Sequence, residues 1–234
     1  ATHRIIRCKQ RSDFFKAGLL IGLVNMAIII SLSLLSGNLF TPNTFIRLIM
    51  GMIGGIFSGI IVSGTIPLFE TLLGYTTDIK LLELANLNQP IFQQMIMVAP
   101  GTYHHSIVVA SMVESAAEAI SANSLLAKVS AYYHDIGKIK KPIYYIENQE
   151  NWENKHDSLT PQMSSLVIIS HVKDGCALAK DYKLGRPIID IIRQHHGTSI
   201  VSYFYEKAKK NENISGQCTL ESDFRYPGPK PLSK

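Results

Sequence analysis

Two long uncharged runs near the N-terminus dominate the pattern of hydrophobic and polar positions. Residues 17–36 and residues 48–69 contain no charged side chain. Each run is long enough to cross the hydrocarbon core of a bilayer as a helix. A short break that contains Asn38, Pro42 and Asn43 separates them. The pattern therefore predicts a transmembrane helical hairpin over residues 17–69.

The charge next to this hairpin predicts its orientation. Residues 1–16 carry one acid, Asp13, and five basic residues: Arg4, Arg7, Lys9, Arg11 and Lys16. Basic segments beside membrane spans stay on the cytoplasmic side, so the loop between the spans should face outward. Everything after Phe69 would return to the cytoplasm. The net charge of +5 could also suit nucleic acid, but the cluster lies directly beside a span, and we expect no nucleic-acid partner.

Small and polar residues inside the two runs suggest contacts between helices. Gly51, Gly55 and Gly59 recur every four residues, which makes a stripe suited to close packing against another membrane helix. A glycine-rich span without a specific partner explains the same stripe equally well. Asn25 in the first run suggests a hydrogen bond to a neighbouring helix.

After residue 69 the pattern is helical as far as about residue 210. Residues 70–103 form a connector in which Leu81, Leu82, Leu84 and Leu87 fit an amphipathic helix before Pro90. No run alternates with a period of two, so the fold class is all-α. We expect residues 211–234 to form a loop. The helices predicted for residues 104–234 are 104–120 with Thr102 as N-cap, 124–136 capped by Ser124, 160–171 opened by Thr160-Pro161, one beginning at Asp174, 187–196 before Gly197, and 199–210.

Histidines recur along these helices together with one carboxylate. The candidate ligands are His105, His134, Asp135, His171, His195 and His196. Five imidazoles and a carboxylate exceed what one tetrahedral zinc needs, and there is no thiolate partner. They suit two divalent transition-metal ions bridged by Asp135, which would activate water and clamp a phosphoryl group. Lys138, one helical turn after His134, could offset charge on a phosphate, so Asp135 and Lys138 are the predicted catalytic residues.

Each histidine also has an ordinary structural explanation. His105 and His171 could be satisfied core residues, and His195-His196 could favour a helix C-terminus. These explanations must all hold together, whereas one metal site accounts for five positions. We expect His104 to be a supporting or solvent residue and His156 to be solvated or to face substrate, and we discount His3.

With these residues assembled, the chain resembles the HD-domain metal-dependent phosphohydrolases. It is most similar to the seven-transmembrane HD subfamily, which degrades the bacterial second messenger cyclic di-AMP. The likeness covers the whole chain, and the two spans would be the last of seven. The motifs that carry it are Ala99–Ser106 (APGTYHHS), Tyr133–Lys138 (YHDIGK), Ile146–Gln149 (IENQ), Ile169–Val172 (ISHV), Gln194–Thr198 (QHHGT) and Tyr226–Lys230 (YPGPK).

The resemblance implies an all-α HD domain over residues 104–234 with a dinuclear iron or manganese centre. The six candidate ligands would hold the metals, Asp135 would bridge them and Lys138 would contact phosphate. Cyclic di-AMP would be opened to linear pApA. The protein would sit in the cell membrane as a multi-pass protein with the HD domain in the cytoplasm. Its partners would be lipid and further transmembrane helices, and a homodimer is left open.

The chain departs from the family pattern at its end. The family's ligand set finishes with an Asp on a later helix, which we expect beyond Lys234; Asp223 lies in a proline-bounded loop and is not a candidate. The chain begins with Ala rather than Met, which suggests a fragment or a processed product. Because it would lack one ligand and the helix that packs it, we expect the fragment to bind metal poorly and turn over slowly, although the parent protein would be an active enzyme. Two alternatives stay open: an HD phosphohydrolase for another nucleotide, and a receptor that binds a nucleotide without cutting it.

Overall fold

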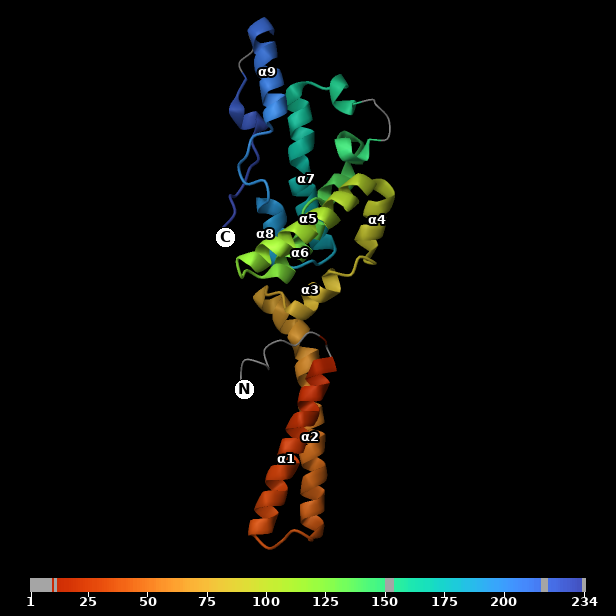
Figure 1. Ribbon diagram of the computed structural model, residues 1–234, viewed down its shortest axis with the longest axis vertical. Helices are drawn as coiled ribbons and strands as arrows, with labels where there is room; N and C mark the ends of the chain where they lie inside the picture. Colours follow the sequence, from red (N-terminus) through yellow and green to blue (C-terminus); the bar gives the residue numbers. More distant parts are fainter. Residues whose placement is uncertain (1–9, 11, 150–153, 216–218, 233–234) are drawn as a thin grey trace. The chain divides into compact units, whose positions relative to one another are not determined.

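The computed structural model describes residue 10, residues 12–149, 154–215 and 219–232 (Figure 1). It divides into two compact units, residues 1–80 and 81–234. Within the described part, all regular secondary structure is helical, apart from one isolated β-bridge between Ile200 and Arg225. The all-α prediction is therefore confirmed. His3 and the basic residues Arg4, Arg7, Lys9 and Arg11 lie outside the described residues.

The first unit contains the predicted hairpin. Helix α1 covers Ser12–Leu35 and helix α2 covers Pro42–Leu73. Both helices are long and apolar enough to cross a membrane. Pro42 was assigned to the break, but it occupies the first turn of α2, because the Thr41 side chain caps this helix by accepting from the Thr44 N–H. The second span therefore begins earlier than its uncharged run.

The two helices of the hairpin approach each other through glycine. A Cβ on Gly55 would overlap the backbone of Gly22, and a Cβ on Gly59 would lie 2.7 Å from the Phe14 carbonyl oxygen. The glycine stripe of α2 therefore packs closely against α1, as one of the two interpretations predicted. The Asn25 side chain donates a long hydrogen bond, 3.5 Å, to the Gly51 carbonyl.

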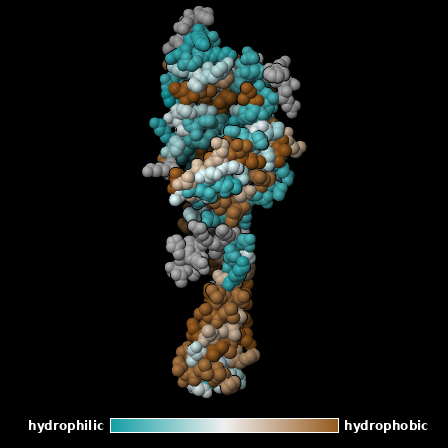
Figure 2. Space-filling view, in the orientation of Figure 1, coloured by the Kyte–Doolittle hydropathy of each residue, from teal (hydrophilic) through white to brown (hydrophobic). Residues whose placement is uncertain are grey.

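Most of the side chains on the hairpin surface are apolar. Figure 2 shows apolar residues over nearly all of its visible face. In the most apolar windows of α1 and α2, only 17% and 11% of the residues are buried. A core helix of a soluble protein would be mostly buried, so this distribution favours helices that face lipid.

The second unit packs short helices around one main core. The N-terminal part of this core comes from α3 and α4, where Leu81, Leu84, Ile91, Phe92 and Met95 are buried. The helices are α3 (Asp78–Leu84), α4 (Pro90–Val98), α5 (Pro100–Ala119), α6 (Ser124–Tyr133), α7 (Pro161–Asp181), α8 (Arg186–Gln194) and α9 (Ser202–Ser215). Short 3-10 turns are η2 (Ile136–Lys140), η3 (Pro142–Tyr144), η4 (Ile146–Asn148), η5 (Lys155–Ser158) and η6 (Glu221–Phe224).

Several helix boundaries differ from the sequence-based expectations. Helix α5 begins at Pro100, so Thr102 is inside it rather than at its N-cap. Asn123, not Ser124, caps α6, because its side chain accepts from the Leu126 N–H. Helix α7 runs unbroken past His171 and Asp174, since nothing in that stretch stops a helix once its apolar face is buried. Helix α6 ends at Tyr133, three residues early, and α9 covers Ser202–Ser215 rather than 199–210.

Candidate metal centre

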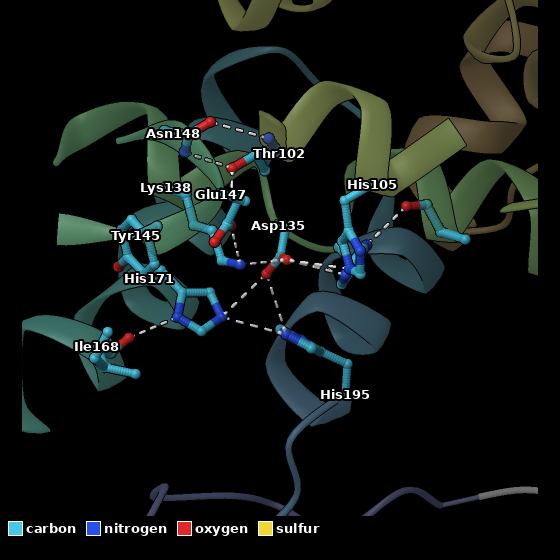
Figure 3. Close-up of polar contacts among 12 residues, drawn as sticks. Thr102, His105, Asp135, Lys138, Tyr145, Glu147, Asn148, Ile168, His171 and His195 are labelled. Atoms are coloured by element: carbon cyan, nitrogen blue, oxygen red, sulfur yellow. Dashed lines mark hydrogen bonds and ion pairs between the residues drawn. The ribbon is translucent and has the colours of Figure 1, made fainter. Parts of the chain in front are cut away.

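All six predicted ligands lie together in the second unit. His105 comes from α5, His134 and Asp135 from the junction of α6 and η2, His171 from α7, and His195 and His196 from the end of α8. Figure 3 shows Asp135 between His105 on one side and His171 and His195 on the other. Residues far apart in the chain are therefore brought to one carboxylate.

Buried aromatic side chains hold the end of α6 in place. Tyr133 is fully buried, its hydroxyl donates to the Leu84 carbonyl at 2.8 Å, and its ring lies 4.8 Å from that of Phe92. The chain then leaves the α-helix and enters the 3-10 turn η2. His134 and Asp135, the two residues between α6 and η2, are thereby fixed against the core.

Glycine lets η2 approach α7. A Cβ at Gly137 would overlap the carbonyl oxygen of His171 and would come 2.5 Å from the Gly175 amide nitrogen. Backbone therefore packs on backbone at this point, which only glycine allows. The contact sets the separation between Asp135 and His171.

The two carboxylate oxygens of Asp135 face different groups of histidines. Its Oδ2 lies 3.1 Å from His134 Nε2 and 4.0 Å from His105 Nε2. Its Oδ1 lies 3.3 Å from His171 Nε2 and 3.6 Å from His195 Nε2. The side chain is almost inaccessible, with 3% of the residue exposed. This is the arrangement expected of a carboxylate that bridges two ions.

Three of the histidines are held in one tautomer by the backbone. The Nδ1 atoms of His134, His171 and His195 lie 2.8, 2.6 and 2.7 Å from the carbonyl oxygens of Ala131, Ile168 and Ile192. A carbonyl oxygen can only accept, so each Nδ1 donates its proton there. The lone pair of each neutral ring is then on Nε2, the atom that faces Asp135.

The electrostatics of this cluster favour a bound cation. Burial lowers the pKa of His171 to about 4, and burial followed by the neighbouring His195 lowers the pKa of His196 to about 3. Burial would raise the pKa of Asp135, but the His134 and His195 imidazoles hold it well below its usual value. Neutral His171 and His196 rings and an ionised Asp135 are in the protonation states of metal ligands. Burial would lower the pKa of His134 as well, but its contact with Asp135 gives a net increase.

The spacing of the ligand atoms and an unpaired carboxylate oxygen also fit a metal site. Among the described residues, two groups hold ligand atoms within 4.8 Å of one another, and they share Asp135: one with His171, His195 and His196, the other with His105 and His134. Asp135 Oδ1 is buried without a hydrogen-bond partner. Lone pairs on His171 and His195 point at this oxygen, and a cation would satisfy all three atoms. The cluster can therefore bind metal.

Lys138 lies on the same side of Asp135 as His134. Its Nζ is 2.9 Å from Asp135 Oδ2 and 2.7 Å from Glu147 Oε1. Burial lowers the pKa of Lys138, but the charge of Asp135 and the Glu147 hydrogen bond give a net increase, so the ammonium stays charged. The spacing predicted Lys138 one α-helical turn after His134, but Lys138 reaches this position through the 3-10 turn η2.

Two further side chains at the site were not predicted from the sequence. Glu147 pairs with Lys138, and Tyr226 stacks on His196 with ring centroids 4.2 Å apart. Both belong to motifs that carried the family resemblance, at Ile146–Gln149 and Tyr226–Lys230, and that was the only signal for them.

The remaining candidates lie away from the cluster. His104 is exposed, as expected for a solvent residue. The prediction for His156 was wrong: it is buried, its Nε2 donates to the Tyr144 carbonyl at 2.8 Å, and its ring lies 4.9 Å from that of Phe204. The polar local sequence concealed a partner from the distant α9. Asp223 is exposed in η6 and, in the described part of the chain, belongs to neither ligand group.

Comparisons with known proteins agree with this geometry. Residues 1–77 match the model of a 7TM receptor with intracellular HD hydrolase, and residues 102–221 match the HD domain. The cyclic-di-AMP phosphodiesterase PgpH of Bacillus subtilis (strain 168) is 45% identical over 225 residues, which are 96% of this chain and 31% of that protein. The PgpH of Listeria monocytogenes serotype 1/2a (strain 10403S) is 45% identical over 227 residues, again 96% and 31%. The chain thus spans about a third of the length of these relatives.

A solved structure of a related HD domain also matches this chain. The L. monocytogenes PgpH HD domain in complex with cyclic-di-AMP is 50% identical, with a TM-score of 0.58. The match covers 63% of this chain and 67% of that one.

Proposed function

Because the chain belongs to the HD-domain family, we propose that it is part of a membrane-anchored, metal-dependent phosphodiesterase that hydrolyses cyclic di-AMP to linear pApA. The observation that carries this proposal is Asp135, whose two oxygens each face a separate group of histidines. One buried carboxylate shared by two ligand groups suits a pair of ions rather than one.

In this proposal His105 and His134 would hold one ion, His171, His195 and His196 would hold the other, and Asp135 would be shared between the two groups. The ions are iron or manganese, which imidazole and carboxylate ligands suit. When bound, such a pair acidifies water and neutralises charge on a phosphoryl group. Lys138 binds a phosphate oxygen of the substrate, and the backbone carbonyls behind His134, His171 and His195 keep their Nε2 lone pairs directed inward.

The substrate is inferred from the relatives. Two cyclic-di-AMP phosphodiesterases match nearly all of this chain, and a similar HD domain has been solved with cyclic-di-AMP. We assign residues 1–16 to a basic cytoplasmic segment, 17–69 to the spans, 70–103 to a connector and 104–234 to the catalytic domain. A homodimer is compatible with this organisation.

We further propose a multi-pass cell-membrane protein with the HD domain in the cytoplasm. The five basic residues before Ala17 support this orientation through the positive-inside rule. The apolar outer surface of the hairpin would contact lipid and further transmembrane helices (Figure 2). A cysteine placed at Gly37, between the spans, should react with an impermeant thiol reagent from outside intact cells. Labelling only after lysis would reverse the orientation.

The activity is tested on the intact protein loaded with manganese or with iron. Cyclic di-AMP, other cyclic dinucleotides and nucleoside polyphosphates are supplied in parallel, and linear product is measured by chromatography. We expect pApA from cyclic di-AMP. Faster hydrolysis of another nucleotide would show that the proposed substrate is wrong. Asp135→Ala should lower turnover by about a thousandfold or more, because it removes the carboxylate that belongs to both ligand groups. Tight nucleotide binding without product would indicate a receptor.

A further inference from the structure

Lys138 is shared between two carboxylates. Its Nζ lies 2.9 Å from Asp135 Oδ2 and 2.7 Å from Glu147 Oε1, and the side chain is 14% exposed. The Tyr145 ring packs beside it with its centroid 5.0 Å from Nζ. Among the described residues, Asp135 and Glu147 are the two acids that pair with this ammonium.

Metal binding would weaken the pairing of Lys138 with Asp135. Asp135 Oδ2 faces His105 and His134 as well as Lys138. A cation held by those ligands would use the lone pairs that Lys138 now contacts, and it would repel the ammonium. Glu147 would then be the remaining anion that holds Lys138 beside the site.

Glu147 is itself held by the start of α5. Thr102 Oγ1 donates to Glu147 Oε1 at 3.1 Å, and Asn148 Nδ2 donates to Thr102 Oγ1 at 2.8 Å. Asn148 Oδ1 also accepts the Thr102 N–H at 3.0 Å. Figure 3 shows this chain of contacts from Asn148 through Thr102 to Glu147 and Lys138. The direction of each bond is defined, because the hydroxyl accepts from the amide and gives its proton to the carboxylate.

The same contact completes the helix end. Ala99 at the N-cap of α5 has no polar side chain, so the first N–H groups of the helix need partners from elsewhere. Asn148 supplies one of them, 46 residues along the chain. Gly101 permits the close approach, because a Cβ there would overlap the Glu147 carbonyl oxygen. The turn η4 is therefore docked on α5 one helical turn before His105.

We propose that Glu147 is a positioning residue: it holds Lys138 toward the substrate phosphate when Asp135 is engaged by metal, and Thr102 and Asn148 hold Glu147 in that orientation. This proposal rests on the phosphodiesterase function proposed above. Glu147 acts through Lys138 and not on the reacting atoms.

A double-mutant cycle tests this dependence in the intact, manganese-loaded protein. Glu147→Gln should lower kcat/KM for cyclic di-AMP by about tenfold to a hundredfold, the range for a lost charged hydrogen bond. In a Lys138→Met background the same change should cost nothing further. An equal loss in both backgrounds would show that Glu147 does not act through Lys138 and would overturn the proposal.

A matched control uses a second glutamate–lysine pair, between α5 and α6. Glu114 pairs with Lys128 at 2.8 Å, away from the histidine cluster. Glu114→Gln should leave kcat/KM within about twofold, because partly exposed pairs contribute little. A loss as large as that of Glu147→Gln would mean that removing any glutamate charge from this unit disturbs the enzyme, which contradicts the proposal.

The Thr102 hydroxyl is tested by a conservative pair. Thr102→Ser keeps the donor and acceptor and should retain activity, whereas Thr102→Val keeps the shape and should lose about fivefold to tenfold in kcat/KM. Equal activity of the two variants would remove Thr102 and Asn148 from the proposal.

A readout without turnover separates this inference from the proposed function. In a crystal structure of the metal-loaded protein, Lys138 Nζ should stay within hydrogen-bond distance of Glu147, and it should move away in Glu147→Gln. If Lys138 leaves Glu147 in the unaltered protein, the positioning role fails, although the phosphodiesterase activity would stand. If the contact persists but no cyclic dinucleotide is cut, the proposed substrate fails while the positioning of Lys138 stands.

Discussion

The hairpin of α1 and α2 and the helical unit around Asp135 bury opposite kinds of side chain. In the hairpin the contact face is made of small residues, with Gly18, Gly22 and Ser33 buried in α1, while leucine, isoleucine and phenylalanine face outward. In the helical unit the apolar residues are inside, and the Asp135 carboxylate and His171 are buried among them. Lipid removes the hydrophobic drive to bury leucine, so packing decides the first contact, whereas water imposes that drive on the second.

Both units nevertheless use glycine in the same way. Gly55 lies against the backbone of Gly22 in the hairpin, and Gly137 lies against the backbone of His171 beside the histidine cluster. In the hairpin the close approach joins two helices. In the helical unit it also sets the geometry of ligands, so an equal change in the two places should have unequal consequences.

Acid should produce the largest difference between the two units. In the metal-free protein the pKa values of His171 and His196 lie near 4 and 3, below their ordinary value of about 6.5. As pH falls below 6.5, the unfolded chain takes up protons that the folded unit does not. The free energy of unfolding should therefore fall by about 1.4 kcal/mol per pH unit for each of these two histidines, or up to roughly 4 kcal/mol by pH 5. His134 offsets part of this loss, because its contact with Asp135 raises its pKa and so stabilises the fold at low pH.

Denaturant titrations of the metal-free protein at pH 7, 6 and 5 measure this loss. His196→Gln should reduce the slope by about half. Asp135 adds a further loss only below pH 4, because its lowered pKa stabilises the fold above that value. A stability that does not change between pH 7 and 5 would contradict the buried, neutral histidines.

Gly137→Val should have the next largest effect. The side chain would occupy the space of the His171 carbonyl, and we expect a loss of about 3 kcal/mol in the stability of the helical unit together with weaker metal binding. Thermal unfolding and metal analysis measure the two effects. Lys140→Ala, an exposed change in the same turn, should alter neither. An unchanged melting temperature for Gly137→Val would rule out the backbone contact.

Gly55→Val should separate the helices of the hairpin at a cost of about 2 kcal/mol. The measurement is disulfide formation between cysteines introduced at Ser33 and Thr44, whose hydroxyl oxygens lie 3.5 Å apart, with the native cysteines replaced. Gly54→Val is the matched control, because a Cβ at Gly54 meets no atom within 4 Å. Equal disulfide yields for the two variants would contradict the close packing of Gly55 against α1.

Asn25→Ala should have the smallest effect. The hydrogen bond to Gly51 is 3.5 Å long, and such bonds between membrane helices contribute about 0.6 kcal/mol. The same disulfide assay should show a small decrease in yield. A collapse of the yield would mean that this polar contact, rather than glycine packing, holds the hairpin together.

The elements of this fold were largely predictable, but their boundaries were less so. Uncharged length predicted both spans, and Thr160-Pro161 marked the start of α7, where the Thr160 side chain accepts from the Met163 N–H. The start of α5 was misplaced, because the partner that caps it, Asn148, is distant in the chain. His156 was misassigned for the same reason, since Phe204 from α9 covers it.

The sequence by itself determined the two spans, the all-α class and which histidines could meet one carboxylate, because length, periodicity and residue type are local properties. Tertiary structure alone decided that the two oxygens of Asp135 face different histidines and that Lys138 pairs with both Asp135 and Glu147. These relations depend on how η2 packs on α7 and how η4 docks on α5. Packing between segments far apart in the chain sets such distances, and no local pattern encodes them.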